Sequence, residues 1–398
     1  MTELAERFPL GAALDLAAFT RDPYPMFARM RAEEPVSWIP ALNIFYATRY
    51  EDVVDILRDD ETFRVGAEHM LVYDTFGKHM MTIDGAAQRR YRMAMRGPFA
   101  AKFIRQNLEK KIAQLVDDLI DGFARDGAVE LRQAFANKLP VRTMLAVFGL
   151  PPEDEPLLRQ WYDTFERALA NYTWDEQIRS DARVCVGEFK SHLLSRIDAL
   201  RAAPDESLLA ALAATEGEGK LTDDEIAQNA LIIFFGGIST VEALILNAFY
   251  VFACQPELYA RVKGDRMLLP KALEEIVRWS SPVQAVTRYV ANDTTVAGVA
   301  LRKGDLVNCM IGSANRDERI FERPDEVDID RPDLSRHIAF ATGPHVCLGN
   351  QLARAEGRTA IERLLDRLPG LEVNLEKLTP PKGYEFRQPS ALSVIWSA

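Results

Sequence analysis

The stretch Phe340-Ala-Thr-Gly-Pro-His-Val-Cys-Leu-Gly349 places one cysteine, Cys347, between two glycines and directly before a segment that favours a helix. A thiolate is the reactive form of cysteine, and the free amides and positive dipole at a helix start stabilise it. Gly343 and Gly349 allow tight turns and let a flat ligand approach the backbone. His345 is placed to contact an anionic group on that ligand. A lone cysteine is more often a buried structural residue, so the surrounding pattern carries the prediction of a ligand site.

A second motif, Glu275-Ile-Val-Arg278, lies about seventy residues before Cys347. Side chains at i and i+3 share one helix face. On its own this spacing is equally typical of an ordinary surface ion pair, which contributes well under about 1 kcal/mol. Whether Glu275 and Arg278 form more than a surface ion pair must therefore be judged from the other motifs in the sequence.

A long helix is predicted from Thr222 to about Cys254. Thr222-Asp-Asp-Glu225 is a capping box, and we expect the helix to run unbroken to the Gln255-Pro256 dipeptide. Gly236 and Gly237 lie in its middle, where each glycine costs about 1 kcal/mol relative to alanine. They indicate either close approach of a flat ligand or tight helix–helix packing, and a nearby hydroxyl can bend the helix by bonding to the carbonyl four residues earlier.

Taken together, these motifs resemble those of the cytochrome P450 family, the haem-thiolate monooxygenases. The Phe340–Gly349 segment resembles the haem-binding loop, which implies that Cys347 is the axial thiolate ligand of a non-covalent haem b and pushes electron density onto the iron. Glu275 and Arg278 resemble the E-x-x-R pair, and Arg331 fits the third, structural arginine of the family. The resemblance adds a set of residues that face the haem: Phe340, Gly343, Gly349, Gly236 and Gly237.

The segment Gly236-Gly237-Ile238-Ser239-Thr240 resembles the oxygen-activating groove of the family's central helix. By that resemblance Thr240 helps to deliver protons to bound dioxygen. The preceding residue is usually an acid in the family, and here it is Ser239. We therefore expect either a relay through Ser239 and water, a relay through Glu242, or a reaction other than simple hydroxylation.

The resemblance also implies partners for the two haem propionates, since partly buried carboxylates need paired donors. His345 precedes the cysteine, Arg288 follows the E-x-x-R helix, and Gln88 with Arg92 matches a segment that often reads H-x-x-x-R. Gln88 replaces a histidine there and would donate a hydrogen bond without charge.

Composition restricts the class of protein. The chain has 398 residues and a formal net charge of −11, which argues against a nucleic-acid-binding protein. Its four cysteines include no C-x-x-C pair, which favours a reducing cytoplasm. The longest run of apolar residues and glycine, Ala230–Ile238, is shorter than the roughly 20 residues of a spanning helix. We expect a cytoplasmic protein that does not insert into a membrane.

The predicted fold is mostly α with small β-sheets, a single cytochrome P450 haem domain over residues 1–398. A hairpin is expected from Val36–Ile39 and Ile44–Ala47, since β-branched and aromatic residues flank Pro40 and Asn43. Strand-like segments return late in the chain, where they could pair with the early ones: Ala285–Val290, Thr295–Val299, Leu306–Met310 and Leu392–Trp396.

A basic segment, Gly85–Leu108, contains no acidic residue. It is predicted as a helix that is either simply solvated or a docking face for an acidic electron carrier, since complementary charge steers encounter. The resemblance favours a [2Fe-2S] ferredoxin supplied by an NAD(P)H-dependent ferredoxin reductase, with Arg354 and Arg358 adding to the face. The basic residues of the segment are Arg89, Arg90, Arg92, Arg96, Lys102 and Arg105.

An apolar substrate pocket is expected from the family's topology, with O2 as co-substrate. Tyr73, His79 and Gln284 are candidate polar anchors. The leading hypothesis is hydroxylation or epoxidation of an apolar small molecule. The alternatives are desaturation, cyclisation or coupling, peroxide-driven oxidation, and a non-catalytic haem-thiolate gas sensor. The predicted pocket residues are Tyr73, Met81, Ile233, Val283, Val286 and Leu392.

Overall fold

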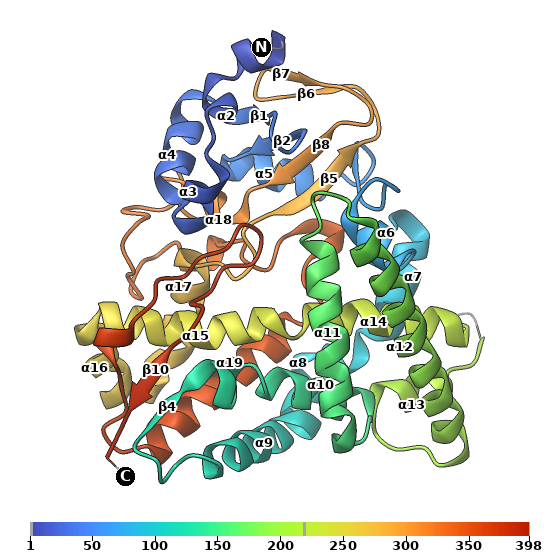
Figure 1. Ribbon diagram of the computed structural model, residues 1–398, viewed down its shortest axis with the longest axis vertical. Helices are drawn as coiled ribbons and strands as arrows, with labels where there is room; N and C mark the ends of the chain where they lie inside the picture. Colours follow the sequence, from blue (N-terminus) through green and yellow to red (C-terminus); the bar gives the residue numbers. More distant parts are fainter. Residues whose placement is uncertain (1–2, 218–219, 398) are drawn as a thin grey trace.

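The computed structural model describes residues 3–217 and 220–397, and it is mainly helical (Figure 1). This confirms the predicted fold class. The helices are α1 (Glu3–Arg7), α2 (Pro9–Ala12), α3 (Leu16–Arg21), α4 (Tyr24–Glu33), α5 (Tyr50–Arg58), α6 (Leu71–Phe76), α7 (Gly85–Met95), α8 (Ala101–Phe103), α9 (Glu109–Asp121), α10 (Leu139–Phe148), α11 (Glu155–Leu169), α12 (Glu176–Ala202), α13 (Leu208–Ala213), α14 (Asp223–Gly236), α15 (Ser239–Cys254), α16 (Pro256–Gly264), α17 (Leu269–Trp279), α18 (Ile311–Ala314) and α19 (Asn350–Arg367).

The largest sheet joins the two ends of the chain, in the order β1-β2-β8-β5-β3. The hairpin β1 (Val36–Ile39) and β2 (Ile44–Ala47) has the predicted bounds. Strand β2 then pairs in parallel with β8 (Leu306–Cys309), and β8 pairs antiparallel with β5 (Val286–Val290). The predicted pairing between early and late strands is therefore confirmed, and β3 (Phe63–Arg64) completes the sheet.

Two smaller sheets lie elsewhere. Strand β10 (Ser393–Ile395) pairs with β4 (Ala128–Glu130) and β9 (Glu372–Val373). The single strand expected over Thr295–Val299 is wrong: β6 (Thr294–Val296) and β7 (Val299–Leu301) form a hairpin. Ala297 and Gly298 both have positive φ, 46° and 79°, and such a pair makes the tight turn that suits the twist of a hairpin.

The long apolar helix crosses the molecule as two segments in line, α14 and α15 (Figure 1). The capping box at Thr222 and Glu225 is present. The prediction of an unbroken helix is wrong, because Gly237 and Ile238 interrupt it. The Thr240 hydroxyl donates to the Gly236 carbonyl oxygen at 2.8 Å, the helix-bending hydrogen bond that the sequence suggested.

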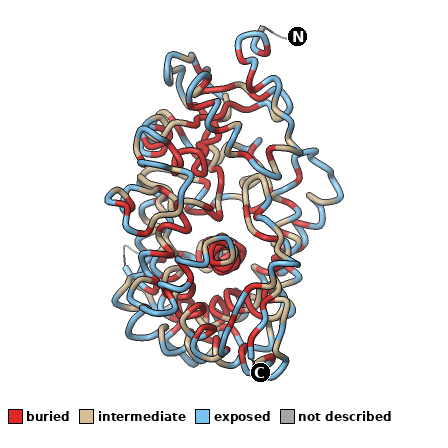
Figure 2. The backbone as a smooth tube through the Cα atoms, turned by 90° about the vertical axis from the view of Figure 1, so that its left-hand side faces the viewer, coloured by how far each residue is buried: buried red, intermediate tan, exposed pale blue. Residues whose placement is uncertain are grey.

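This helix pair forms the centre of the core. Figure 2 shows it end-on and mostly buried. It is long and apolar enough to cross a membrane, but 78% of its most apolar window is buried inside the protein, as in the core helix of a globular domain. Helix α15 packs against α17 and α19, and α19 packs in turn against α9. The cavity described below lies between this helical layer and the large sheet.

Candidate functional site

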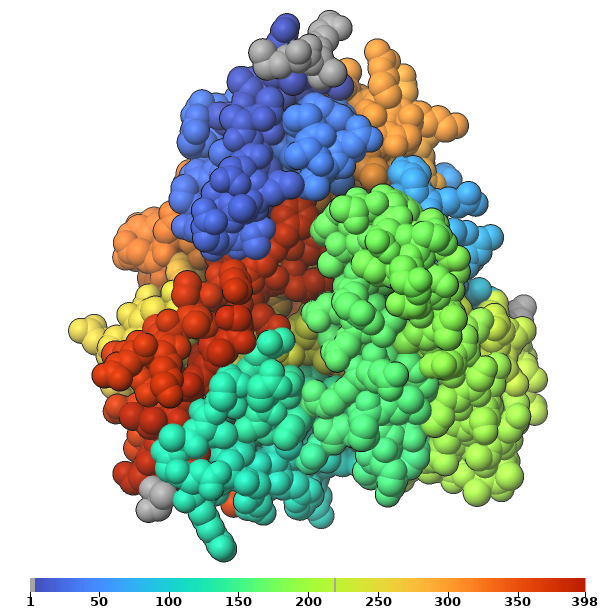
Figure 3. All heavy atoms as spheres, viewed as in Figure 1, coloured from blue at the N-terminus to red at the C-terminus, as the bar shows by residue number. Residues whose placement is uncertain are grey.

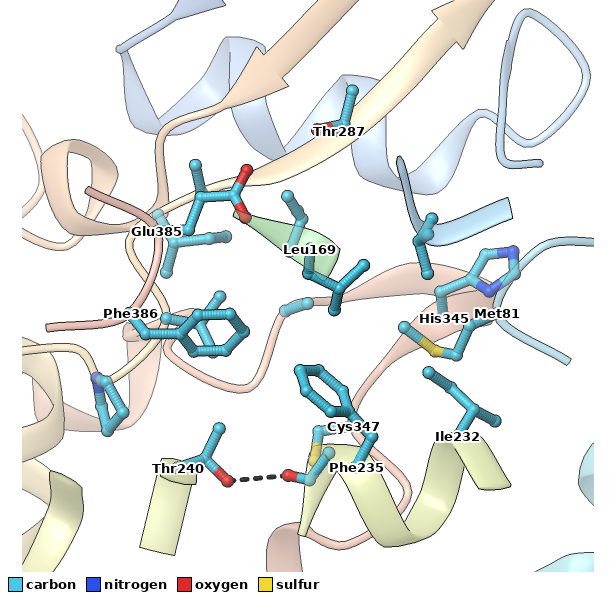
Figure 4. A pocket seen from close by; sticks show the side chains of 18 of the residues that line it. Met81, Leu169, Ile232, Phe235, Thr240, Thr287, His345, Cys347, Glu385 and Phe386 are labelled. Atoms are coloured by element: carbon cyan, nitrogen blue, oxygen red, sulfur yellow. Dashed lines mark hydrogen bonds between the residues drawn. The ribbon is translucent and has the colours of Figure 1, made fainter. Parts of the chain in front are cut away.

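A cavity of about 880 Å³ opens above the junction of α14 and α15. Its walls come from segments far apart in the chain (Figure 4): the residues around α6, the ends of α7 and α11, strand β5, the loop before α19, and residues 384–386. Most lining side chains are apolar. Such a cavity suits a small molecule that is largely apolar, oriented by a few polar groups.

Cys347 projects into this cavity from the loop before α19. Its backbone N–H donates to the Phe340 carbonyl oxygen at 2.9 Å, and Asn350 Nδ2 donates to the Cys347 carbonyl oxygen at 2.6 Å. Burial raises the pKa of the Cys347 thiol, and the Gly349 N–H, Arg92 and Arg354 offset this only in part. Stabilising a thiolate at this position would therefore need a further positive charge, such as that of a bound metal ion.

The four glycines of the predicted site have different surroundings. Gly343 has φ +75°, and a Cβ there would lie 2.3 Å from the Leu57 carbonyl oxygen, so this glycine serves loop packing. Gly237 faces Met144, whose sulfur would lie 2.9 Å from an added Cβ. Gly236 and Gly349 line the cavity, and an added Cβ would meet nothing within 4 Å at either position. Helix packing and open ligand space thus each account for one glycine of the Gly236-Gly237 pair.

Two guanidinium groups, one buried and one half-buried, face the cavity without an acidic partner among the described residues. Arg92 on α7 and Arg288 on β5 both line it, and Arg288 makes one hydrogen bond, to the Thr287 carbonyl oxygen. Burial lowers the pKa of both side chains. His345 lies beside them with Nε2 2.8 Å from Asp84 Oδ1, and its buried Nδ1 has no partner. This part of the cavity is matched to a ligand with more than one anionic group.

Gln88 does not take part as predicted. Its side chain is buried and its Nε2 donates to the Pro344 carbonyl oxygen at 2.9 Å, so it ties α7 to the cysteine loop. It is not among the cavity's lining residues. The position four residues later on the same helix, Arg92, is the one that turns toward the cavity.

Glu275, Arg278 and Arg331 meet behind the cysteine loop, as the sequence suggested. Both Glu275 oxygens accept from Arg278, at 2.7 Å each, and from Arg331 Nε, at 3.0 and 3.1 Å. Side-chain exposure is 3% or less for all three. The arginines also donate to carbonyl oxygens of the 315–326 segment. This cluster fastens the segment that precedes the loop.

Comparison with known proteins identifies the family to which this chain belongs. The family described as Cytochrome P450 matches residues 156–382. The chain is 31% identical to the vitamin D(3) 25-hydroxylase of Pseudonocardia autotrophica, over 90% of each chain, and 31% identical to the nocardicin C N-oxygenase of Nocardia uniformis subsp. tsuyamanensis, over 98% of each. The crystal structure of CalO2 superposes with a TM-score of 0.88 at 28% identity, covering 97% of this chain and 99% of that one. The chain belongs to the cytochrome P450 family.

As a cytochrome P450 the protein is an oxidoreductase that binds haem b non-covalently and uses O2, a redox partner and a small-molecule substrate. The residues present fit that group. Haem carries two carboxylates, and the cavity offers the guanidinium groups of Arg92 and Arg288 and an unpartnered imidazole nitrogen. Gly236 and Gly349 leave open space on the backbone beside them.

The predicted proton relay of this P450 is only partly assembled at the cavity. Thr240 lines it (Figure 4), whereas Ser239 and Glu242 do not. Ser239 is buried on another side of α15. Glu242 is also buried, forms an ion pair with Arg132 and accepts from Gln388 Nε2 at 3.2 Å. At about 100° of rotation per helical residue, Glu242 lies about 200° from Thr240 and so faces away from it.

A different carboxyl group reaches the cavity, and sequence reasoning missed it. Glu356 on α19 lines it, is 1% exposed, and has no hydrogen-bond partner for either oxygen. Burial raises the pKa of Glu356 to about 8. The sequence offered only a weak signal, because a glutamate among apolar residues on the helix after Cys347 can be either buried or exposed.

Some of the predicted substrate residues line the cavity, and others do not. Met81, Ile233, Val283 and Val286 line the cavity, together with Phe340. Tyr73 does not line it, and Leu392 is fully buried in the core instead. The candidate anchors His79 and Gln284 are buried outside the lining, and burial lowers the pKa of His79 to about 3. Tyr172 and Trp174, from the stretch Phe165–Trp174 that the family's topology suggested, line the cavity, whereas sequence reasoning missed Tyr384, Glu385 and Phe386.

The basic segment Gly85–Leu108 is broken into short helices. Its basic side chains have different surroundings. Arg90 pairs with Glu225, and Arg92 faces the cavity. Arg354 pairs with Glu274 and Arg358 with Glu109. The remaining basic side chains of the segment are exposed and form no ion pair within the described residues: Arg89, Arg96, Lys102 and Arg105.

Proposed function

We propose that Cys347 is the axial thiolate ligand of haem b and that the enzyme inserts oxygen into a largely apolar small molecule. Arg92, Arg288 and the Nδ1 side of His345 would hold the haem propionates. The observation that supports this most is that Cys347, Thr240 and two arginines without an ion-pair partner, Arg92 and Arg288, line one largely apolar cavity. When bound, haem with a thiolate ligand activates O2 with two electrons, places one oxygen atom in the substrate and releases the other as water.

The chain's own residues position protons and exclude water. Thr240 keeps its hydroxyl in place through the hydrogen bond to the Gly236 carbonyl oxygen. Glu356, with its pKa raised to about 8, holds a proton at neutral pH in the same cavity. We infer that Thr240 and Glu356, rather than Ser239 and Glu242, control proton supply, with ordered water between them. Ser239 lies off the cavity, so its replacement of the usual acid does not favour the alternative reactions.

The first test is the absorption spectrum of the purified protein, ferric and then reduced under carbon monoxide. The thiolate-type Soret band should appear in wild type and disappear in Cys347→Ser, with Cys254→Ser as the control for thiol removal. A band that survives in Cys347→Ser would refute the ligand assignment. A panel of steroids, terpenoids and fatty acids then identifies a substrate by its shift of the spin state, and product analysis separates hydroxylation from desaturation or coupling.

Proton delivery is tested by Thr240→Ala. We expect unchanged carbon monoxide spectra but a several-fold higher share of electrons lost to peroxide. The matched control is Thr215→Ala, because the Thr215 hydroxyl also donates to the carbonyl oxygen four residues earlier, at 2.9 Å, on an exposed helix end. Equal peroxide yields from the two variants would contradict the role of Thr240.

The electron donor is proposed to be a small acidic [2Fe-2S] ferredoxin with its NAD(P)H-dependent reductase. Four exposed basic side chains, at 89, 96, 102 and 105, support this. Because the attraction acts between exposed charges, the rate of reduction should fall as ionic strength rises. The double variant Arg96→Glu, Arg105→Glu should slow reduction at least tenfold at low salt. The proposal includes a cytoplasmic location, where thiols such as Cys347 stay reduced.

A further inference from the structure

Glu385 places a carboxylate inside an otherwise mostly apolar cavity. Its side chain points into the same space as Thr240 and Cys347, with Phe386 between Glu385 and Thr240 (Figure 4). No Arg, Lys or His among the described residues forms an ion pair with it. The other buried glutamates outside the cavity differ in this respect, since Glu242 and Glu275 are both paired with arginines.

The backbone of Glu385 is held firmly. Gln284 N–H donates to the Glu385 carbonyl oxygen at 2.7 Å, and Arg387 N–H donates to the Pro282 carbonyl oxygen at 2.9 Å. Gly383, at φ +136°, lets the chain turn back on itself, because a Cβ there would lie 1.7 Å from the Phe386 carbonyl oxygen. In Figure 3 the red C-terminal segment that contains this turn lies between the blue N-terminal residues and the green α11–α12 region. The carboxylate is thus presented by a fixed turn.

Aromatic side chains surround the carboxylate on the cavity side. Tyr172 and Tyr384 pack edge to face with ring centroids 5.8 Å apart, and both line the cavity. Trp174 lines the cavity as well, but the Arg179 guanidinium already lies over its ring, 5.4 Å from the centroid. Aromatic faces attract cations by their quadrupole.

This end of the cavity therefore carries an acidic group that no cation balances. Burial raises the pKa of Glu385 to about 7, and the neighbouring Tyr172 hydroxyl acts in the opposite direction. A carboxylate in a largely apolar cavity is unfavourable when no cation balances its charge, whereas a cation that enters the cavity would relieve this and gain the aromatic contacts. An anionic ligand group would meet repulsion instead. The two guanidinium groups of the cavity are already matched to the haem propionates.

We propose that Glu385, with Tyr172 and Tyr384, binds a protonated or quaternary amine on the substrate, so that the substrate class is an amphipathic amine. The apolar part of that molecule would extend past Phe386 toward Thr240 and Cys347, and the amine would stay at the opposite end. This proposal rests on the proposed function for the site of oxidation, and it adds the chemical class of the substrate.

The test compares three ten-carbon probes on the haem-loaded protein by isothermal titration calorimetry: decyltrimethylammonium, 1-decanol and decanoate. A quaternary ammonium cannot coordinate iron, so its binding reports the cavity alone. We expect a dissociation constant at least tenfold lower for the cation than for the alcohol, and the weakest binding for decanoate. Equal or tighter binding of 1-decanol to the wild type would overturn the proposal, whatever the variants do.

The variant arm assigns the effect to one side chain. Glu385→Gln should weaken binding of decyltrimethylammonium at least tenfold and change binding of 1-decanol less than threefold. Glu376→Gln is the matched control, because Glu376 is exposed and unpaired among the described residues and its substitution removes the same charge. If Glu385→Gln retains the preference for the cation, the assignment is wrong. Loss of the thiolate-type carbon monoxide band would instead overturn the haem ligand, and calorimetry detects the cation site independently of that result.

Discussion

Replacing Glu275 with glutamine should destabilise the protein far more than an isosteric change normally does. The carboxylate accepts from two guanidinium groups and from the Asp328 N–H at 2.8 Å, in a place where the side chains are 0–3% exposed. Glutamine keeps the size but removes the charge, and its NH2 group meets donors. Breaking a buried pair by removing one partner typically costs about 3–5 kcal/mol.

The remaining hydrogen bonds set the expected size of this loss. Arg278 and Arg331 keep carbonyl acceptors at positions 315, 322, 324 and 326, so neither guanidinium is left without partners. We therefore expect about 3–5 kcal/mol and not the sum of five lost bonds. With an unfolding entropy of about 2.1 cal/mol/K per residue, a chain of 398 residues should lose about 4–6 °C in its thermal midpoint.

Calorimetric and circular-dichroism melting of the haem-loaded protein measures this change. Glu376→Gln, on the exposed surface, should shift the midpoint by less than 1 °C, since surface substitutions stay within about 0.5 kcal/mol. Arg331→Lys should be intermediate, because lysine keeps the charge but loses the forked geometry. A Glu275→Gln midpoint within 1 °C of wild type would show that the cluster does not hold the segment before the cysteine loop.

Three further predictions concern single positions. Glu385→Gln should match wild type in stability near pH 4.5 and be more stable than wild type by up to about 3 kcal/mol at pH 8. Burial raises the pKa of Glu385 from 4.5 to about 7. The folded wild type therefore loses stability as the pH rises from 4.5 to 7. Urea unfolding at pH 4.5, 6 and 8 checks this, and a difference that does not vary with pH would contradict it. Gly343→Ala should cost about 2 kcal/mol more than Gly85→Ala in thermal unfolding, because both glycines have positive φ but only Gly343 lacks room for a Cβ; equal losses would remove the packing argument. Gly236→Ala should stabilise the apoprotein by about 0.5–1 kcal/mol and lower haem retention in gel filtration, whereas Gly237→Ala must displace Met144; unchanged haem retention in Gly236→Ala would show that its open face is not ligand space.

Local patterns in the sequence predicted the elements that local chemistry decides. The Val36–Ala47 hairpin and the Thr222 capping box were confirmed, since each depends on a few neighbouring residues. The break at Gly237 was missed, because it arises from Met144 packing on one side and open cavity on the other. The error over Glu242 was avoidable, since a two-residue offset on a helix places a side chain on the opposite face.

The acidic end of the cavity had no sequence signal. Glu385 stands in a loop without periodicity, and its surroundings come from Gln284 and Tyr172, which are distant in the chain. The family resemblance found Arg92 and Arg288, which line the cavity, but it also predicted a role there for Gln88, which does not line it. A motif fixes spacing along the chain, whereas the direction of each side chain depends on the loop that packs beside it.

The walls of the cavity also govern when it can form. Strand β2 pairs in parallel with β8 across some 260 residues, and Phe386 lines the same cavity as Pro40, far earlier in the chain. Pairings so distant in sequence carry a large loop-closure entropy and slow folding. A chain emerging during synthesis can form its early helices and the first hairpin, but the cofactor has no complete cavity to enter until residue 386 has been made. Haem capture should therefore be a late step in the maturation of this protein.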